Sequence, residues 1–293
     1  MIDIKQLSLE KPVLIAGPTA SGKSALALEI AAAQSRMIVN ADALQVYDGW
    51  RILTARPSDA DLNTAPHALY GHVPFDAAYS VGDWLRDMRG FVASPAPAPI
   101  IIGGTGLYFA ALTEGLAEIP DTPLSLRDAA NARMTDDGIA PFLAELDAET
   151  RAAIDTQNPM RVQRAWEVLT HTGRSIRDWQ RDTPPPLLGL ENTHPFVLTC
   201  DKIWLNERIE RRFHQMIDQG ALDEARSMLP NWSPDFLSSK AIGAPELIAH
   251  LQGDMDIDAA IEAAIIGSRQ YAKRQRSWFR SRMKSWTPIQ PDL

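Results

Sequence analysis

The segment that most constrains the fold lies at residues 12–24. The apolar run Pro12-Val-Leu-Ile-Ala16 leads directly into Gly17-Pro-Thr-Ala-Ser-Gly-Lys-Ser24, and a helical pattern of apolar residues follows at once. A Gly-x-x-x-x-Gly-Lys-Ser sequence between a buried strand and a helix is the pattern of a P-loop, whose backbone N–H groups surround a phosphate group. The alternative is a glycine-rich turn that only starts a helix. The complete pattern in this context favours polyphosphate binding on a parallel α/β sheet.

The residues of this loop have distinct predicted tasks. The glycines let several N–H groups face one anion, the helix N-terminus adds a partial positive charge, and Lys23 adds a full one. The hydroxyl of Ser24 is placed to bind Mg²⁺, so magnesium is the expected cofactor. The predicted polyphosphate site comprises Gly17, Pro18, Thr19, Ala20, Ser21, Gly22, Lys23 and Ser24.

Two further short apolar runs indicate strands that end in polar or glycine-rich sequence. Met37-Ile-Val-Asn40 runs into Asp42, and Ile100-Ile-Ile102 runs into Gly103-Gly-Thr105-Gly106. Ligands of open parallel sheets bind beyond the carboxyl ends of the strands. We therefore expect Asp42 and the second glycine turn at the same edge as the P-loop. A purely structural role of Asp42, as a helix N-cap after the strand, is the alternative.

The alternation of strands and helices stops near residue 121. Helical patterns follow at 123–134, 139–154, 158–172 and 174–181 without an intervening apolar strand, and Phe196-Val-Leu-Thr-Cys200 indicates that the sheet resumes. The predicted fold is therefore α/β, with a P-loop NTPase-like parallel sheet core and helical C-terminal region in residues 1–120 and 191–293. An all-helical lobe, residues 121–190, is inserted into it.

The last predicted helix, from about Asp256 to Lys284, changes character at its midpoint. Aromatic residues alternate there with seven cations and no acid: Arg269, Lys273, Arg274, Arg276, Arg280, Arg282 and Lys284. One interpretation is a solvated helix face whose aromatics pack on the core. Because the whole chain carries a net charge of -8, this local excess favours binding to a nucleic-acid backbone. A helix can do both, with aromatics inward and cations outward.

Composition excludes several classes of protein. The single cysteine, Cys200, rules out an intrachain disulfide, the six histidines lack metal-ligand spacing, and no apolar run reaches 18 residues. We expect a cytoplasmic protein, by default a monomer, without a zinc site or a membrane partner.

Three classes of function remain compatible with these features. A small-molecule kinase would use Asp42 as the magnesium carboxylate. A non-catalytic RNA-binding protein would use the basic helix beside a degenerate nucleotide site. An enzyme that releases diphosphate and takes a nucleic acid as the nucleophile would use both features, and we favour it.

The motifs, taken together, resemble those of the tRNA dimethylallyltransferase, or tRNA isopentenyltransferase, family. The matching blocks occur in family order over nearly the whole chain: Gly17-Pro-Thr-Ala-Ser-Gly-Lys-Ser24, Asn40-Ala-Asp-Ala-Leu-Gln-Val-Tyr47, Thr54-Ala-Arg-Pro57, Gly103-Gly-Thr-Gly-Leu-Tyr108, Asn158-Pro-Met-Arg-Val-Gln-Arg-Ala165, Lys240-Ala-Ile-Gly243 and Tyr271-Ala-Lys-Arg-Gln-Arg-Ser-Trp-Phe-Arg280.

This resemblance implies a reaction and a set of roles. The family transfers a dimethylallyl group from dimethylallyl diphosphate to the N6 amine of adenosine 37, in the anticodon stem-loop of tRNAs that read codons beginning with U. The P-loop then holds the diphosphate with Mg²⁺, Asp42 is the general base, and Thr105 and Arg212 contact the diphosphate, with Arg208 and Arg211 as neighbouring candidates for the arginine. The implied tRNA contacts, with two cations of the basic helix added, are Asp42, Ala43, Leu44, Gln45, Met160, Arg161, Val162, Gln163, Arg164, Lys273 and Arg274.

The chain departs from the family pattern in places that bear on tRNA selectivity. Ala43 and Leu44 stand where polar or flexible residues are usual, Met160 stands where Gln is frequent, and Ala244-Pro245 follows Ala-Ile-Gly in place of Tyr and a cation. These differences leave the P-loop, Asp42, Thr105 and Arg212 unaffected.

Overall fold

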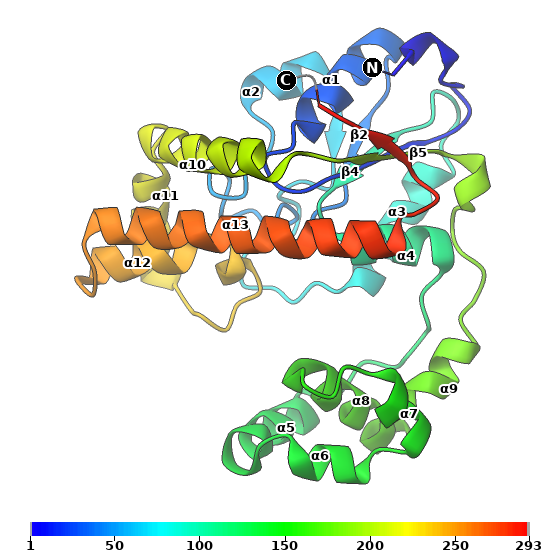
Figure 1. The fold of residues 1–293 in the computed structure, drawn as a ribbon, viewed down its shortest axis with the longest axis vertical. Coiled ribbons are helices and arrows are strands. Elements are labelled where there is room, and N and C mark those ends of the chain that lie inside the picture. The colour runs from blue at the N-terminus through cyan, green and yellow to red at the C-terminus, as the bar shows by residue number, and fades with distance from the viewer. Residues whose placement is uncertain (1, 292–293) are drawn as a thin grey trace. The chain divides into compact units, whose positions relative to one another are not determined.

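A computed structural model describes residues 2–291 of the chain, which form two compact units (Figure 1). The first unit contains residues up to Thr113 and from Leu187 onward, and the second is Glu114–Pro186. The limits of the second unit lie a few residues before those predicted for the inserted lobe, 121 and 190. The reason at its C-terminal side is that Leu188 is buried in the core of the first unit, where its N–H donates to the carbonyl of Leu112 at 3.1 Å.

The first unit is built on a six-stranded sheet in the order β3-β2-β4-β1-β5-β6, and each neighbouring pair is parallel. Four strands correspond to predicted runs: β1 (Val13–Ala16), β2 (Ile38–Asn40), β4 (Ile100–Gly103) and β5 (His194–Leu198). The two edge strands, β3 (His67–Ala68) and β6 (Thr287–Ile289), were not predicted. The prediction of a parallel α/β core is confirmed.

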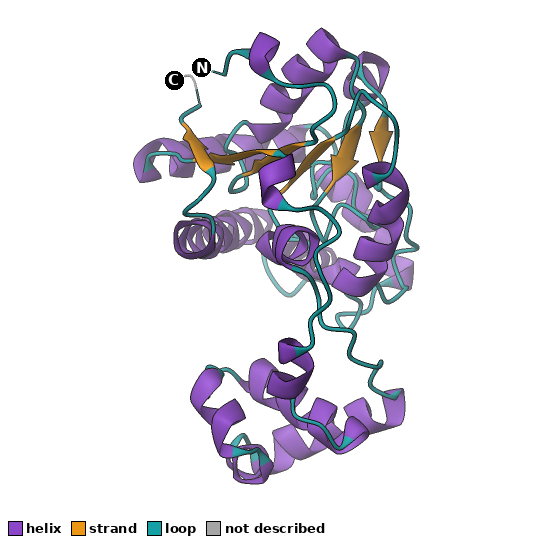
Figure 2. Ribbon diagram, turned by 90° about the vertical axis from the view of Figure 1, so that its right-hand side faces the viewer, coloured by secondary structure: helices purple, strands orange, loops and turns teal. Residues whose placement is uncertain are grey.

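Helices cover both faces of this sheet (Figure 2). Alternate strand residues point to opposite faces, so β1 directs Val13 and Ile15 toward α1 (Lys23–Gln34), and Leu14 and Ala16 toward the other layer. That layer contains α3 (Val81–Val92), α4 (Gly106–Glu114) and the end of the long helix α13 (Ile257–Arg282).

The remaining helices of the first unit form a second core beside the sheet. It is made by α10 (Lys202–Asp218), α11 (Ala221–Met228), α12 (Ala244–Gln252) and the first half of α13. Trp50 and Leu53, from the segment after β2, are buried in the same core. The unit also contains α2 (Asp59–Thr64) and the short 3-10 turns Ile4–Gln6, Leu190–Asn192, Leu229–Asn231 and Ser238–Lys240.

Local sequence explains where two key helices begin. Ser80 caps α3 in a capping box with Asp83, and Asp256 caps α13 by accepting a hydrogen bond from the N–H of Ala259 at 2.8 Å. The start of α13 agrees with the sequence prediction, and this helix ends two residues before the predicted limit at Lys284. Among the residues that the structure describes, no helix has the length and apolar character needed to cross a membrane.

The second unit is entirely helical. It contains α5 (Leu124–Asp137), α6 (Ala140–Glu145), α7 (Ala148–Ala153), α8 (Pro159–Thr172) and α9 (Ile176–Arg181). The window predicted as one helix at 139–154 is two helices, because Asp147 adopts an extended backbone and caps α7. The core of the unit centres on Phe142 and Trp166, and Arg133 lies over both rings.

Candidate active site

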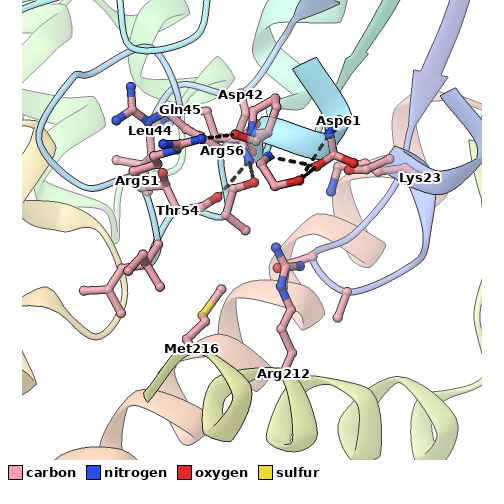
Figure 3. A pocket seen from close by; sticks show the side chains of 18 of the residues that line it. Lys23, Asp42, Leu44, Gln45, Arg51, Thr54, Arg56, Asp61, Arg212 and Met216 are labelled. Atoms are coloured by element: carbon pink, nitrogen blue, oxygen red, sulfur yellow. Dashed lines mark hydrogen bonds between the residues drawn. The ribbon is translucent and has the colours of Figure 1, made fainter. Parts of the chain in front are cut away.

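A cavity of about 960 Å³ lies in the first unit, beside the carboxyl ends of the strands (Figure 3). The P-loop and the start of α1 form one side, and α10 lies across from the segment that follows β2. Its wall combines cations, carboxylates and apolar side chains, among them Lys23, Ser24, Asp42, Leu44, Gln45, Arg51, Leu53, Arg56, Asp61, Arg208, Arg212, Phe213, Met216 and Tyr271.

The P-loop places its lysine at this cavity. Gly22 adopts the left-handed backbone region, with φ at 91°, and so turns the chain into α1 without the strain that a side chain would cause. The Lys23 amino group lies 3.4 Å from the carbonyl of Pro18. Burial lowers the pKa of Lys23 to about 8, Asp42 opposes this shift, and Arg212 adds to it. Lys23 is therefore a cation whose charge is stabilised further by any anion that enters.

The hydroxyl of Ser24 also faces the cavity, from the first turn of α1. No group of three or more His, Cys, Asp or Glu side chains in residues 2–291 can hold a metal ion by itself. A single hydroxyl, that of Ser24, is compatible with Mg²⁺. This ion commonly takes most of its ligands from substrate phosphates and water and few from the protein.

Asp42 lies beyond the end of β2, at the predicted edge. Asn40 Oδ1 accepts a hydrogen bond from the N–H of Asp42 at 2.9 Å, and Asp42 Oδ1 accepts one from the N–H of Leu44 at 3.0 Å. These bonds fix the carboxylate at the cavity wall, on the side of Lys23 and Arg212. Within this turn only Oδ1 accepts a hydrogen bond. The other oxygen, Oδ2, lies near Gly104, since a methyl group on Gly104 would be 3.2 Å from it.

The three candidate arginines of α10 all line the cavity but differ in what they contact. Arg208 Nε donates to the carbonyl of Ala20 in the P-loop at 3.0 Å, and its guanidinium lies over the Trp204 ring. Arg212 points from α10 into the cavity toward Asp42 and Lys23 (Figure 3). Burial lowers the pKa of Arg212, while Asp42 favours its charged form. Arg208 therefore supports the loop, and Arg212 is the arginine best placed to meet a ligand.

Thr105 connects two segments of the site. Its hydroxyl accepts a hydrogen bond from the N–H of Ala43 at 2.9 Å, which ties the turn after β4 to the segment after β2. Gly103 allows this close approach, because a methyl group there would lie 1.9 Å from the carbonyl oxygen of Ala41. Thr105 itself is not among the residues that line the cavity.

Residues 51–57 form a wall of the cavity, and two side chains hold them in place. Gln45 Nε2 donates to the carbonyls of Thr54 and Ala55 at 2.7 and 3.0 Å. Glu224, on α11, accepts from the N–H groups of Ile52 and Leu53 at 2.8 and 3.0 Å. Glu224 was not predicted from the sequence, because the contact joins residues more than 170 positions apart.

The residues expected to contact tRNA differ in exposure. Met160 and Arg161 are exposed at the start of α8, and Lys273 and Arg274 are exposed on α13. Val162 and Gln163 are buried: Val162 packs in the core of the second unit, and Gln163 donates to Asn131 and Glu167. Arg164 is half-buried and donates to the hydroxyl of Thr122 at 2.6 Å. The exposed side chains of this segment are therefore those of its first half.

The parallel sheet and the loop between β1 and α1 define an α/β protein of P-loop NTPase-like fold, with two cations and a carboxylate in the wall of one cavity. Family models narrow this class. An IPP transferase model matches residues 45–282, and an isopentenyl transferase model matches residues 11–69.

Relatives agree with these matches over nearly the whole chain. A protein of Jannaschia sp. named tRNA dimethylallyltransferase is 57% identical over 99% of both chains. One of the same name from Dinoroseobacter shibae is 58% identical over 99% of this chain and 98% of its own. The chain belongs to the IPP transferase family.

Solved structures agree in fold. The tRNA isopentenylpyrophosphate transferase of Bacillus halodurans has a TM-score of 0.67 and 29% identity, covering 96% of this chain and 90% of its own. A eukaryotic dimethylallyltransferase acting on tRNA has a TM-score of 0.79 at 23% identity, over 96% of this chain and 74% of its own. This second likeness concerns the fold alone.

Proposed function

We propose that this protein transfers a dimethylallyl group from dimethylallyl diphosphate to the N6 amine of adenosine 37 in tRNAs that read codons beginning with U. The products are N6-dimethylallyladenosine in the tRNA and free diphosphate. The names of the full-length relatives support this reaction. The observation that carries the proposal is that Lys23, Arg212 and the Asp42 carboxylate line one cavity, where Asp42 favours the charged form of both cations.

The cations match the charge that develops as the donor reacts. When the bond between the allylic carbon and the diphosphate breaks, negative charge moves onto the departing diphosphate. Lys23, Arg212 and the P-loop N–H groups lie where this charge accumulates, and the loss of one such donor costs about 3 kcal/mol of barrier in other enzymes. Magnesium held by Ser24 and the phosphate oxygens would neutralise more of this charge.

Asp42 supplies the second requirement of the reaction. The exocyclic amine of adenine is a weak nucleophile, because its lone pair is delocalised into the ring. A carboxylate within hydrogen-bond reach accepts the amine proton as the C–N bond forms, typically contributing 10²- to 10⁴-fold in rate. The apolar side chains of Leu53, Phe213 and Met216 in the same wall offer a surface to the five-carbon group.

An RNA substrate accounts for the exposed cations of α13. Lys273 and Arg274 are exposed, whereas Phe279 of the same helix is buried in the sheet core, so the helix presents charge outward. Met160 and Arg161 would bind RNA from the second unit. Affinity for tRNA should therefore fall steeply with salt, and neutralising Lys273 and Arg274 should flatten that slope by about 0.7 to 0.9 for each phosphate group that the helix no longer binds.

The proposal is tested by incubating the protein with labelled dimethylallyl diphosphate and unmodified tRNA, followed by mass spectrometry of the tRNA nucleosides. We expect label on adenosine next to the anticodon. Asp42→Asn should slow turnover roughly 10²- to 10⁴-fold with little change in tRNA affinity. Unchanged turnover in this variant would remove Asp42 from its role.

The same experiment separates this reaction from the kinase that the P-loop also allows. A kinase would consume ATP in the presence of a small metabolite and without tRNA, and the named relatives do not favour it. The expected cytoplasmic location and monomeric state stay predictions, which fractionation and light scattering would check.

A further inference from the structure

One side chain of α13, Gln275, is hydrogen-bonded to the P-loop but is not among the residues that line the cavity. Gln275 is 5% exposed, although exposed cations flank it at Lys273 and Arg274. Its Oε1 accepts a hydrogen bond from the N–H of Thr19 at 2.9 Å, and its Nε2 donates to the carbonyl of Gly104 at 3.0 Å. A single amide group therefore bridges the P-loop and the turn after β4.

The first of these bonds fixes the orientation of a peptide group in the P-loop. In a trans peptide the N–H and the C=O point in opposite directions. Because Gln275 holds the N–H of Thr19 on the α13 side, the carbonyl of Pro18 points the other way, and this carbonyl is the one that lies 3.4 Å from the amino group of Lys23.

The second bond fixes the opposite side of the same site. A methyl group at Gly104 would lie 2.3 Å from Gln275 Nε2 and 3.2 Å from Asp42 Oδ2, so the amide and the carboxylate both pack against this glycine. The next residue, Thr105, holds the segment of Asp42 through the N–H of Ala43. The side chain of Gln275 thus connects the P-loop peptide that contacts Lys23 with the turn that holds the segment of Asp42.

We propose that Gln275 is a positioning residue that sets the P-loop peptide and the turn after β4 at the separation required to bind the diphosphate. This inference rests on the proposed diphosphate site. Without the amide, the Thr19 N–H and the Gly104 carbonyl lose their partners, and the peptide between Pro18 and Thr19 can rotate.

Two substitutions at position 275 test this role. Gln275→Met keeps the length of the side chain and removes both hydrogen bonds, so affinity for inorganic diphosphate and for dimethylallyl diphosphate should fall roughly tenfold. Affinity for tRNA should change less than about twofold, since the exposed cations are retained. Gln270→Met, at an exposed position of the same helix, is the matched control and should bind both ligands as the wild type does.

Gln275→Glu adds a readout that a merely structural role would not give. When protonated, the introduced carboxyl can accept from Thr19 and donate to Gly104, as the amide does. When ionised, it faces the Gly104 carbonyl and lies near the diphosphate. Relative to wild type, its diphosphate affinity should be within about threefold at pH 5.5 and lower by roughly 100-fold at pH 8.5.

Isothermal titration of each variant without tRNA, over pH 5.5 to 8.5 and with thermal unfolding as a check, distinguishes the outcomes. If the wild type binds neither diphosphate, the proposed function fails. If it binds and both Gln275 variants bind equally well at every pH, the role of Gln275 is overturned. Should the variants not fold, hydrogen exchange of the Thr19 amide in the wild type decides: slow exchange before ligand is added supports the bridge, and fast exchange refutes it.

Discussion

The lowered pKa of Lys23 predicts how donor binding depends on pH. Burial is the main cause of the shift to about 8, with Asp42 acting against it and Arg212 adding to it. At pH 7 about nine tenths of the molecules carry the charged amine, and at pH 9 about one tenth. Because a diphosphate binds to the charged form, affinity for dimethylallyl diphosphate should fall about tenfold between pH 7 and pH 9.

The neighbouring cysteine and tyrosines have pKa values above this pH range and so do not titrate together with Lys23. Burial raises the pKa of Cys200 to about 11 and raises the pKa values of Tyr70 and Tyr271 beyond the range of the experiment. Binding at pH 8.5 should take up about three quarters of a proton, because about that fraction of Lys23 is neutral before binding and the bound anion raises its pKa again. Titration calorimetry in buffers of different ionisation enthalpy measures both the affinity and the proton uptake.

Two substitutions are the controls for this prediction. Lys23→Arg should abolish the decline between pH 7 and pH 9, since a guanidinium stays charged throughout. Lys23→Met should bind weakly and with little dependence on pH. A wild-type affinity that is constant from pH 7 to pH 9.5, or a decline of Lys23→Arg in parallel with the wild type, would refute titration of Lys23 as the cause.

Further substitutions test the cavity wall and the packing of α13. Glu224→Ala leaves the backbone N–H groups of Ile52 and Leu53 without a partner and should lower the free energy of unfolding by about 2–3 kcal/mol in urea titrations. The control Asp223→Ala, at an exposed position, should lower it by less than about 0.5 kcal/mol. Gly106→Ala places a methyl group 2.2 Å from the ring of Trp278 and should cost about 1–3 kcal/mol. Gly90→Ala, with open space at the same atom, should stabilise α3 by about 0.5–1 kcal/mol in thermal unfolding.

The parts of the fold that could be predicted are those specified by local sequence. Each of the four central strands contains a short apolar run next to polar or glycine-rich residues, and the cap at Asp256 fixes the start of α13 by a neighbouring side chain. The edge strands β3 and β6 have two and three residues, and β6 contains Pro288. They exist because a neighbouring strand offers free hydrogen-bonding groups, which is information that the short segments do not carry.

The candidate site divides in the same way. The P-loop and Asp42 were predicted because a motif or a strand end places them. Glu224 could not be predicted, since its partners are distant in sequence. Gln275 carried an unused signal: with Ala272 and Phe279 it falls on one face at helical spacing, which marks a buried polar residue on the inner side of a basic helix.

Helix α13 has a buried side and an exposed side, and the helical repeat fixes the angle between them. Ala272, Gln275 and Phe279 are buried against the protein. Lys273 and Arg274 are exposed. Successive residues of a helix are rotated by about 100°, so one inserted or deleted residue would rotate both surfaces downstream of it by about 100° and take Gln275 or Phe279 out of its packing position. An exchange of Lys for Arg among the exposed cations leaves the packing of this stretch intact, whereas a change in its length does not. The helical geometry therefore fixes the angle between the exposed cations and the side chain of Gln275, which contacts the P-loop.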